Sequence, residues 1–197
     1  MMWLVRHGQS AWNVANRIQG QSPRAGSLTP AGRDQAELAA RQLAALVPDG
    51  QLIVASDLAR TAETAAIIAG RLGLPLEFDP SLRELDLGQL EGTSSVEVDG
   101  QSGRTADVID RFWDDPYRRP PGGETVAELY HRIQGALARL AGSWPGADLI
   151  VVTHGGPVRV ATAASLPAPG SPLPRGPVAN ASITPWPGPA HTEMVAP

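Results

Sequence analysis

Residues 149–156 read Leu149-Ile150-Val151-Val152-Thr153-His154-Gly155-Gly156, a β-branched apolar run that stops at a histidine and two glycines. A run of this kind is typical of a strand that is buried on both faces, as in a parallel sheet. Three more short apolar runs occur at Met2–Val5, Leu52–Ala55 and Leu74–Phe78. These four segments predict the strands of one central sheet.

Segments with a helical spacing of apolar residues separate these runs. Thr29 and Pro30 suit the N-cap and first position of a helix, and Gly73 suits a left-handed C-cap. Helices are expected from Pro30 to about Val47, from about Leu58 to Leu72, over Glu124–Leu140 and from Pro157 to about Ala164, and final strands over Ala181–Trp186 and Thr192–Val195. The alternation predicts an α/β fold whose sheet is mostly parallel and covered on both faces.

The length of 197 residues is that of one domain, so residues 1–197 are expected to form a single domain. From Gly88 to Gly123 the periodicity fades and Gly, Ser, Asp and Pro are scattered among a few apolar residues. This composition predicts a loop with a short helix around Ala106–Trp113. We expect residues 93–123 to act as a lid or specificity segment.

The composition excludes several classes of enzyme. The chain has no cysteine, so it has no disulfide, no thiolate nucleophile and no cysteine-ligated metal site. All 16 basic residues are arginine, which excludes a Walker-type phosphate loop and a Schiff-base lysine. The net charge of −4, without an arginine-rich tract, argues against nucleic acid or an acidic membrane as a partner. The first apolar run is too short for a signal peptide or a membrane span, so the cytoplasm is the expected location.

Chemically reactive residues follow the predicted strands directly. Arg6 and His7 follow the first strand, Arg60 comes shortly after the second, Glu84 after the third and His154 after the run at 149–152. In open parallel sheets, ligands bind at the carboxyl ends of the strands. We therefore expect these five side chains to converge on one crevice.

Imidazole and guanidinium groups, without lysine or cysteine, favour a phosphate monoester as substrate. Arg6 and Arg60 can balance its two negative charges, because guanidinium donates bidentate hydrogen bonds to phosphate oxygens. A neutral His7 can attack phosphorus, Glu84 can protonate the leaving oxygen, and His154, preferably as imidazolium, adds a third positive donor. No metal is expected, because neither histidine belongs to a His-x-x-x-His or paired-Asp pattern.

The same residues stand in motifs that resemble those of the histidine phosphatase family, also called phosphoglycerate-mutase-like. The motifs cover nearly the whole chain in order: Arg6-His7-Gly8-Gln9-Ser10, Asn13, Ser56 to Ala65, Leu82 to Gly88, and Thr153-His154-Gly155-Gly156. The resemblance implies a three-layer α/β/α sandwich and a phosphohistidine at His7. It also implies phosphoryl contacts from Arg6, Asn13, Arg60 and His154 and proton donation by Glu84. The backbone N–H groups at Gly155 are a further expected phosphate contact, since they open a helix.

Two features of the motifs bear on the substrate. After the positions of Gln19 and Gly20, the family usually has a short segment that contains an Asp and leads to Leu-Thr. Here residues 21–27 stand in its place and contain no Asp, so Gln19 and Gly20 are weak candidates for substrate binding. Leu90 stands where the family usually has an aromatic residue, close in sequence to Glu84.

The segments Pro121–Thr125 and Asn180–Thr184 look like those of the phosphatase branch that includes broad-specificity and alpha-ribazole phosphatases. The lysine-containing insertion of the mutases is absent.

The sequence thus predicts a phosphomonoester hydrolase that acts on a small phosphorylated metabolite and needs no cofactor. The alternatives are a phosphoglycerate-type mutase and, ranked last, a non-catalytic binding member of the fold. The sequence does not determine the physiological substrate or the oligomeric state, for which a homodimer is one option.

Overall fold

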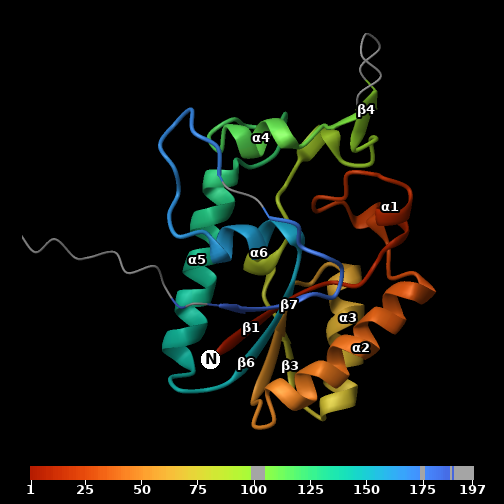
Figure 1. Cartoon of the computed structure of the whole chain (residues 1–197), viewed down its shortest axis with the longest axis vertical. Helices are drawn as coiled ribbons and strands as arrows, with labels where there is room; N and C mark the ends of the chain where they lie inside the picture. Colours follow the sequence, from red (N-terminus) through yellow and green to blue (C-terminus); the bar gives the residue numbers. More distant parts are fainter. Residues whose placement is uncertain (99–104, 174–175, 187, 189–197) are drawn as a thin grey trace, which may run out of the picture.

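A computed structural model describes residues 1–98, 105–173, 176–186 and 188 of the chain. Its centre is a five-stranded sheet in the order β3-β2-β6-β1-β7 (Figure 1). The strands are β1 (Met2–Arg6), β2 (Leu52–Ala55), β3 (Leu76–Phe78), β6 (Leu149–Thr153) and β7 (Ile183–Trp186). All neighbours are parallel except β7, which pairs antiparallel with β1. The predicted α/β fold with a mostly parallel sheet is confirmed.

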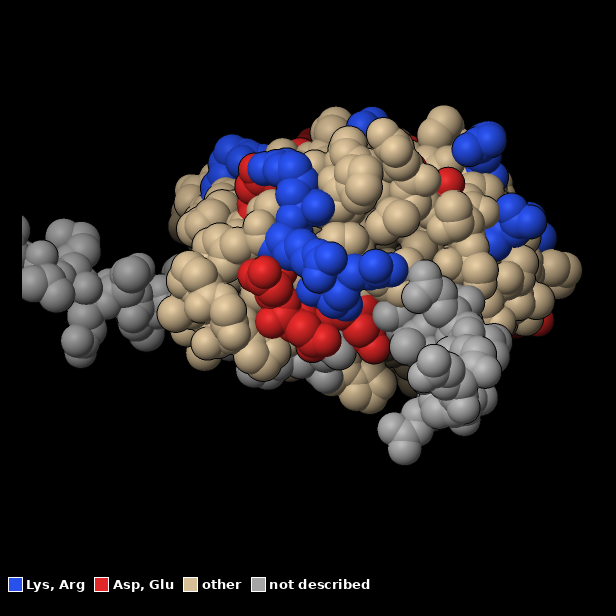
Figure 2. Space-filling model, turned by 90° about the horizontal axis from the view of Figure 1, so that it is seen from above, with Lys and Arg blue, Asp and Glu red and all other residues tan. Residues whose placement is uncertain are grey.

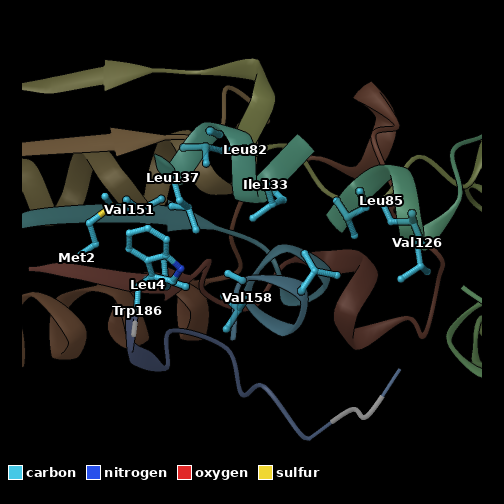
Figure 3. Packing of buried hydrophobic residues seen from close by; sticks show 14 of the residues in the cluster. Met2, Leu4, Leu82, Leu85, Val126, Ile133, Leu137, Val151, Val158 and Trp186 are labelled. Atoms are coloured by element: carbon cyan, nitrogen blue, oxygen red, sulfur yellow. The ribbon is translucent and has the colours of Figure 1, made fainter. Parts of the chain in front are cut away.

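Alternate residues of the strands face two separate cores. Leu4, Leu52 and Val151 pack in one core with helices α5 (Val126–Ser143) and α6 (Gly155–Thr162), as Figure 3 shows in part. The neighbouring strand positions pack in the other core, against α2 (Pro30–Leu46) and α3 (Ala59–Leu72). A sheet with helices on both faces is the expected three-layer α/β/α sandwich.

Local capping explains where the helices begin and end. The hydroxyl of Thr29 accepts a hydrogen bond from the N–H of Gly32, which satisfies a free N–H of the first turn of α2. Gly73 has φ +68° and ψ +25°, the left-handed conformation that ends α3. Thr125 and Glu128 form a capping box, so α5 starts at Val126, two residues later than predicted. Helix α6 starts two residues earlier than predicted, at Gly155.

The connections contain short elements that carry little periodic signal. They are α1 (Ala11–Val14), the 3₁₀ turns η1 (Pro23–Ala25), η2 (Pro80–Leu82) and η3 (Gly88–Leu90), the hairpin strands β4 (Val96–Val98) and β5 (Thr105–Asp107), and α4 (Asp110–Asp114). Within the predicted lid segment, the short helix is therefore present but begins later than expected, and the hairpin was not predicted. Residues 99–104 of that segment, and the predicted strand at 192–195, lie outside the described residues.

Two kinds of feature are absent from the part of the chain that the structure describes. No helix within residues 1–98, 105–173 and 176–186 combines the length and apolar character that a bilayer crossing requires. No group of three or more His, Asp or Glu side chains in this part of the chain is arranged to hold a metal ion.

Candidate active site

A cavity of about 230 Å³ lies at the carboxyl ends of β1 and β6, beside the start of α6. Eight of the nine predicted site residues line it: Arg6, His7, Asn13, Gln19, Gly20, Arg60, Glu84 and Gly155. The ninth, His154, is fully buried beside His7, with the two ring centroids 5.2 Å apart. Seen from above, on the side of α4 and β4, basic and acidic side chains gather next to each other near the middle of the face (Figure 2). The structure thus brings together the predicted site residues that follow the strands.

His7 is held in a single tautomer. Its Nδ1 lies 2.7 Å from the carbonyl oxygen of Gly8, and because a carbonyl can only accept, Nδ1 carries the proton. Nε2 therefore keeps its lone pair, and it accepts a hydrogen bond from Nε of Arg60 at 3.2 Å. Burial, followed by the charges of Arg60 and Arg6, lowers the pKa of His7 well below 6.5, so the ring is neutral at pH 7.

His154 is oriented by Ser56, the first residue after β2. The buried Ser56 hydroxyl lies 2.9 Å from Nε2 of His154 and has no other acceptor within the described part of the chain. Oγ1 of Thr61 lies farther from Nε2, at 3.5 Å, so Ser56 makes the shorter contact. With Ser56 as the donor to Nε2, the ring proton lies on Nδ1, a buried atom without a partner among the described residues. Burial and the charge of Arg60 lower the pKa of His154 well below 6.5. The imidazolium expected from the sequence is therefore disfavoured in the free site, because burial and nearby arginines both oppose a further positive charge.

Arg6 and Arg60 are cations that the protein has partly desolvated. Arg60 is 1% exposed and donates to the carbonyl of Gly20 at 2.8 Å. Arg6 donates to the carbonyl of Val178, while its Nε is buried without a partner in the described part of the chain. Burial lowers the pKa of Arg60 to about 10. No carboxylate forms an ion pair with either arginine among the described residues. A buried unpaired cation is costly, so this arrangement is complementary to an anion.

Glu84 lies against the first turn of α6. Its carboxylate accepts hydrogen bonds from the N–H of Leu85 at 2.9 Å and the N–H of Gly156 at 3.3 Å. A Cβ on Gly156 would lie 2.2 Å from Oε1 of Glu84. Glycine at this position is therefore what allows the carboxylate to approach the helix.

The amide oxygens of Asn13 and Gln19 accept hydrogen bonds from the protein, whereas their amide nitrogens have no acceptor among the described residues. Oδ1 of Asn13 accepts from the N–H of Ser10 at 3.0 Å and from Nδ2 of Asn180 at 3.3 Å. Oε1 of Gln19 accepts from the Ser10 hydroxyl at 2.8 Å. With both carbonyl oxygens occupied, the NH₂ groups of these two cavity residues remain as donors. Gly20 contributes a backbone contact, since its carbonyl binds Arg60.

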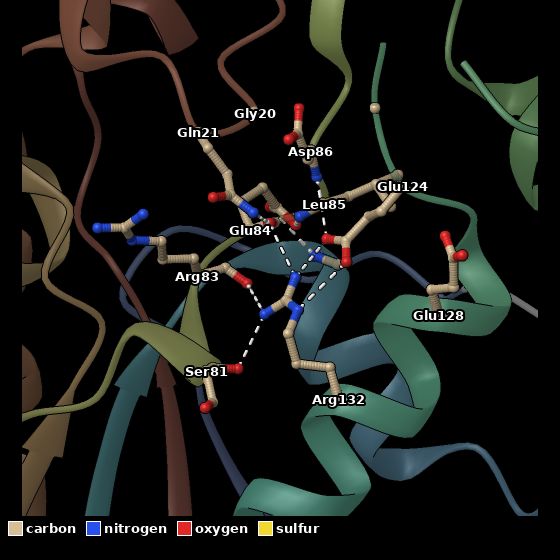
Figure 4. A network of polar contacts seen from close by, with 12 residues as sticks. Gly20, Gln21, Ser81, Arg83, Glu84, Leu85, Asp86, Glu124, Glu128 and Arg132 are labelled. Carbon is tan, nitrogen blue, oxygen red and sulfur yellow. Dashed lines mark hydrogen bonds and ion pairs between the residues drawn. The ribbon is translucent and has the colours of Figure 1, made fainter. Parts of the chain in front are cut away.

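Arg132, on α5, was not predicted from the sequence, yet it holds the loop that carries Glu84 (Figure 4). Its guanidinium donates to the carbonyls of Ser81 at 2.8 Å, Arg83 at 2.9 Å and Glu84 at 3.2 Å. The same group pairs with Glu124, whose Oε1 accepts from the N–H of Asp86 at 3.1 Å. Arg132 and Glu124 together thus bind the backbone on both sides of the acid. The motif at Pro121–Thr125 was the one available signal, because it contains Glu124.

Glu91 joins the same loop to the first substrate loop. Its Oε1 accepts from the N–H of Gln21 at 2.7 Å and the N–H of Leu87 at 3.3 Å. Burial raises the pKa of the Glu91 carboxyl. Gly20 lies beside it with φ +47°, and a Cβ there would meet Glu91 Oε1 at 2.0 Å. Both conditions require glycine at position 20.

Comparison with known proteins places the chain among enzymes that transfer or release phosphoryl groups. The family model of the histidine phosphatase superfamily (branch 1) matches residues 2–186. A probable phosphoglycerate mutase GpmB from Enterobacter sp. (strain 638) is 39% identical over 155 residues, which are 78% of this chain and 69% of the relative.

Two solved structures illustrate the likeness of the fold. A mycobacterial glucosyl-3-phosphoglycerate phosphatase in complex with VO3 superposes with a TM-score of 0.69 at 32% identity, over 81% of this chain and 78% of the other. A protein from Thermus thermophilus has a TM-score of 0.65 at 27% identity, over 95% of each chain.

Proposed function

The chain belongs to the histidine phosphatase superfamily (branch 1), and we propose that it hydrolyses phosphomonoesters of small metabolites through a phosphohistidine at His7. The observation that carries the proposal is the state of His7. Its ring is neutral, its proton sits on Nδ1, and its Nε2 lone pair lies beside an arginine in the wall of the cavity. A nucleophilic nitrogen needs that free lone pair.

In the first step, the phosphoryl group takes the place between Arg6, Arg60, Asn13 and the Nδ1–H of His154. Its oxygens are stronger acceptors than an imidazole nitrogen, so the Arg60 hydrogen bond passes from His7 to the substrate. Nε2 of His7 then forms a bond to phosphorus while the bond from phosphorus to the leaving oxygen breaks. The leaving oxygen takes the electron pair of that bond and a proton from the Glu84 carboxyl.

In the second step, water replaces the alcohol. The Glu84 carboxylate accepts a proton from water as the water oxygen bonds to phosphorus. The bond between phosphorus and Nε2 breaks, and its electron pair returns to the nitrogen. Nδ1 keeps its proton throughout, because its hydrogen bond to the Gly8 carbonyl is not used in either step. The cations hold the charge on the equatorial oxygens during both displacements.

The small volume of the cavity supports a small leaving group. Ligand pockets usually measure about 300–1,000 Å³, and this one is about 230 Å³. A phosphorylated metabolite of a few carbons fits that space better than a nucleotide or a polymer.

Mutase activity is the second candidate, because the relative at 39% identity is named a probable phosphoglycerate mutase. A mutase would return the phosphoryl group to a bound phosphoglycerate instead of to water. Stimulation of transfer by a bisphosphorylated primer, without release of phosphate, would favour this alternative.

The test is to measure phosphate release and acid-labile labelling of the protein with a generic aryl phosphate. His7→Asn should abolish both, while its unfolding transition by circular dichroism stays cooperative. His131→Asn, which changes an exposed histidine on α5, should leave both unchanged. Turnover by His7→Asn equal to that of the wild type would exclude the phosphohistidine mechanism.

A further inference from the structure

The segment that leads into β7 reaches the nucleophile from the far end of the chain. Residues 180–184 belong to a motif of the sequence, yet none of them is among the described residues that line the cavity. We propose that Asn180 is a positioning residue, whose side-chain amide joins the backbone of His7 to Asn13 and turns the NH₂ group of Asn13 toward the phosphoryl group. The inference rests on the proposed function, because it concerns the phosphoryl position of that same site.

The side-chain amide of Asn180 donates two hydrogen bonds. Its Nδ2 lies 3.1 Å from the carbonyl oxygen of His7 and 3.3 Å from Oδ1 of Asn13. A backbone carbonyl can only accept, so the Asn180 atom that faces His7 is the nitrogen. An NH₂ group has two hydrogens, and the second one points at Asn13. The Asn13 atom that faces Asn180 is therefore its oxygen.

This contact decides what Asn13 presents to the cavity. A reversed Asn13 amide would place its NH₂ group against the NH₂ of Asn180 and against the N–H of Ser10, which now donates to Oδ1 at 3.0 Å. Donors that face donors lose their hydrogen bonds, and the reversed orientation is unfavourable for that reason. In the observed orientation, Asn13 offers N–H donors to the cavity that it lines. Reversed, it would offer oxygen lone pairs to an anion.

The backbone of the same segment is anchored to the end of β1. The N–H of Ala181 donates to the His7 carbonyl at 3.2 Å, and the Ser182 carbonyl accepts from the N–H of Arg6 at 3.1 Å. Ala181 is buried with φ +55°, a left-handed conformation that is unfavourable for a residue with a Cβ. Strained backbone of this kind clusters at functional sites. Because these backbone bonds do not involve the Asn180 side chain, its replacement should leave the segment in place.

The experiment measures the dissociation constant of inorganic phosphate by calorimetry in a double-mutant cycle of Asn180→Asp and Asn13→Ala. Asn180→Asp keeps the shape of the side chain but replaces the NH₂ donor by an oxygen acceptor, which attracts the NH₂ of Asn13 away from the cavity. Asn180→Asp should weaken phosphate binding by a factor about tenfold larger with Asn13 present than in the Asn13→Ala background. A charge-assisted hydrogen bond discriminates by about that much. Equal factors in the two backgrounds would overturn the proposal.

Two further variants separate positioning from other effects. Repulsion between the new carboxylate and phosphate acts in both backgrounds, so it cancels when the two factors are compared. Asn16→Asp makes the same chemical change on an exposed residue outside the described cavity wall, and it should leave phosphate binding unchanged. A loss in Asn16→Asp as large as in Asn180→Asp would overturn the proposal.

Asn180→Ala decides the question if Asn180→Asp does not fold. It removes the donor without adding a charge, and Ser10 still binds Oδ1 of Asn13. The factor in the native background should therefore exceed that in Asn13→Ala by about threefold, in the range of a single neutral hydrogen bond. Equal factors here would have the same meaning as for Asn180→Asp.

Failure of this inference and failure of the proposed function give different results, because phosphate binding needs no turnover. If the wild type hydrolyses an aryl phosphate but the two factors are equal, the function stands and the role of Asn180 does not. If no phosphomonoester is hydrolysed but the factors differ as expected, Asn180 positions a phosphate site and the proposed function is wrong. A wild type that binds no phosphate would overturn both.

Discussion

Nε of Arg60 lies 3.2 Å from Nε2 of His7 and donates a hydrogen bond to it, while the opposite ring nitrogen donates to the Gly8 carbonyl. The two contacts fix the same tautomer from both sides. A permanent cation on the nucleophilic nitrogen also opposes its protonation, and the free protein thereby keeps its nucleophile available.

The first prediction concerns the protonation of His7. Because burial and Arg60 lower its pKa, the ring should stay neutral as the pH falls from 7 to about 5.5, where an unperturbed histidine is mostly protonated. Two-dimensional NMR of the imidazole nitrogens in the free protein reports both charge and tautomer. A titration midpoint near 6.5 for His7 would contradict the prediction.

The second prediction is a loss of stability in mild acid. His7 and His154 both have lowered pKa values in the folded protein, so below about pH 6.5 the unfolded chain binds protons that the folded chain does not. The free energy of unfolding should fall with decreasing pH by up to about 1.4 kcal/mol per pH unit for each histidine. Urea unfolding of the wild type and His7→Asn at several pH values measures it, and the variant should have the shallower slope. Parallel slopes would show that His7 does not contribute.

The third prediction separates activity from stability at Gly156. In Gly156→Ala, the new Cβ would meet the end of the flexible Glu84 side chain at 2.2 Å, so the carboxylate should move and the fold should not. We expect phosphate release from alkyl phosphates to drop about tenfold to a hundredfold, with little change in the unfolding midpoint. Gly135→Ala, in the interior of α5 with no described atom within 4 Å of its Cβ position, is the matched control and should only stabilise the protein. A fully active Gly156→Ala would mean that the carboxylate position is not critical.

The fourth prediction tests Arg132 as a positioning residue for Glu84. General-acid catalysis matters most for poor leaving groups, so Arg132→Met should slow alkyl phosphates about tenfold or more and 4-nitrophenyl phosphate much less. Glu84→Gln should show the same pattern. Arg132→Lys keeps the charge but has three N–H donors for the five hydrogen bonds that Arg132 donates, and it should retain part of the defect.

Arg139→Gln is the control for Arg132. Arg139 lies on the same helix and contacts Asp79 and Ser81 at the surface, but within the described structure it does not contact Arg83 or Glu84. Its loss should not alter the dependence on the leaving group. Equal slowing of alkyl and aryl substrates in Arg132→Met would indicate a general structural role instead.

The sequence predicts the framework of this site well because each reactive residue follows its strand within a few positions. Parallel strands end at one edge of the sheet, so position along the chain translates into position in space for His7 and His154. The capping residues Thr29 and Gly73 were equally accessible, since their effects are local.

What the sequence could not predict depends on contacts over long separations. Arg132 binds backbone carbonyls about fifty residues away. Every residue has such a carbonyl, so the types of the residues that Arg132 contacts do not reveal the interaction. The strands of the hairpin β4–β5 have three residues each, which is too short for a periodic signal. The charge state of His154 depends on burial among arginines that only the folded chain assembles.

The order of the strands has a consequence for synthesis on the ribosome. β1 lies between β6 and β7, and the carbonyl of His7 accepts hydrogen bonds from the N–H of Ala181 and from Asn180. More than 140 residues are therefore translated after β1 before its neighbours β6 and β7 are both available for pairing. At about 5–20 residues per second, that interval lasts several seconds or longer. During this time the nascent N-terminal segment lacks both of the strands that cover its edges in the folded protein.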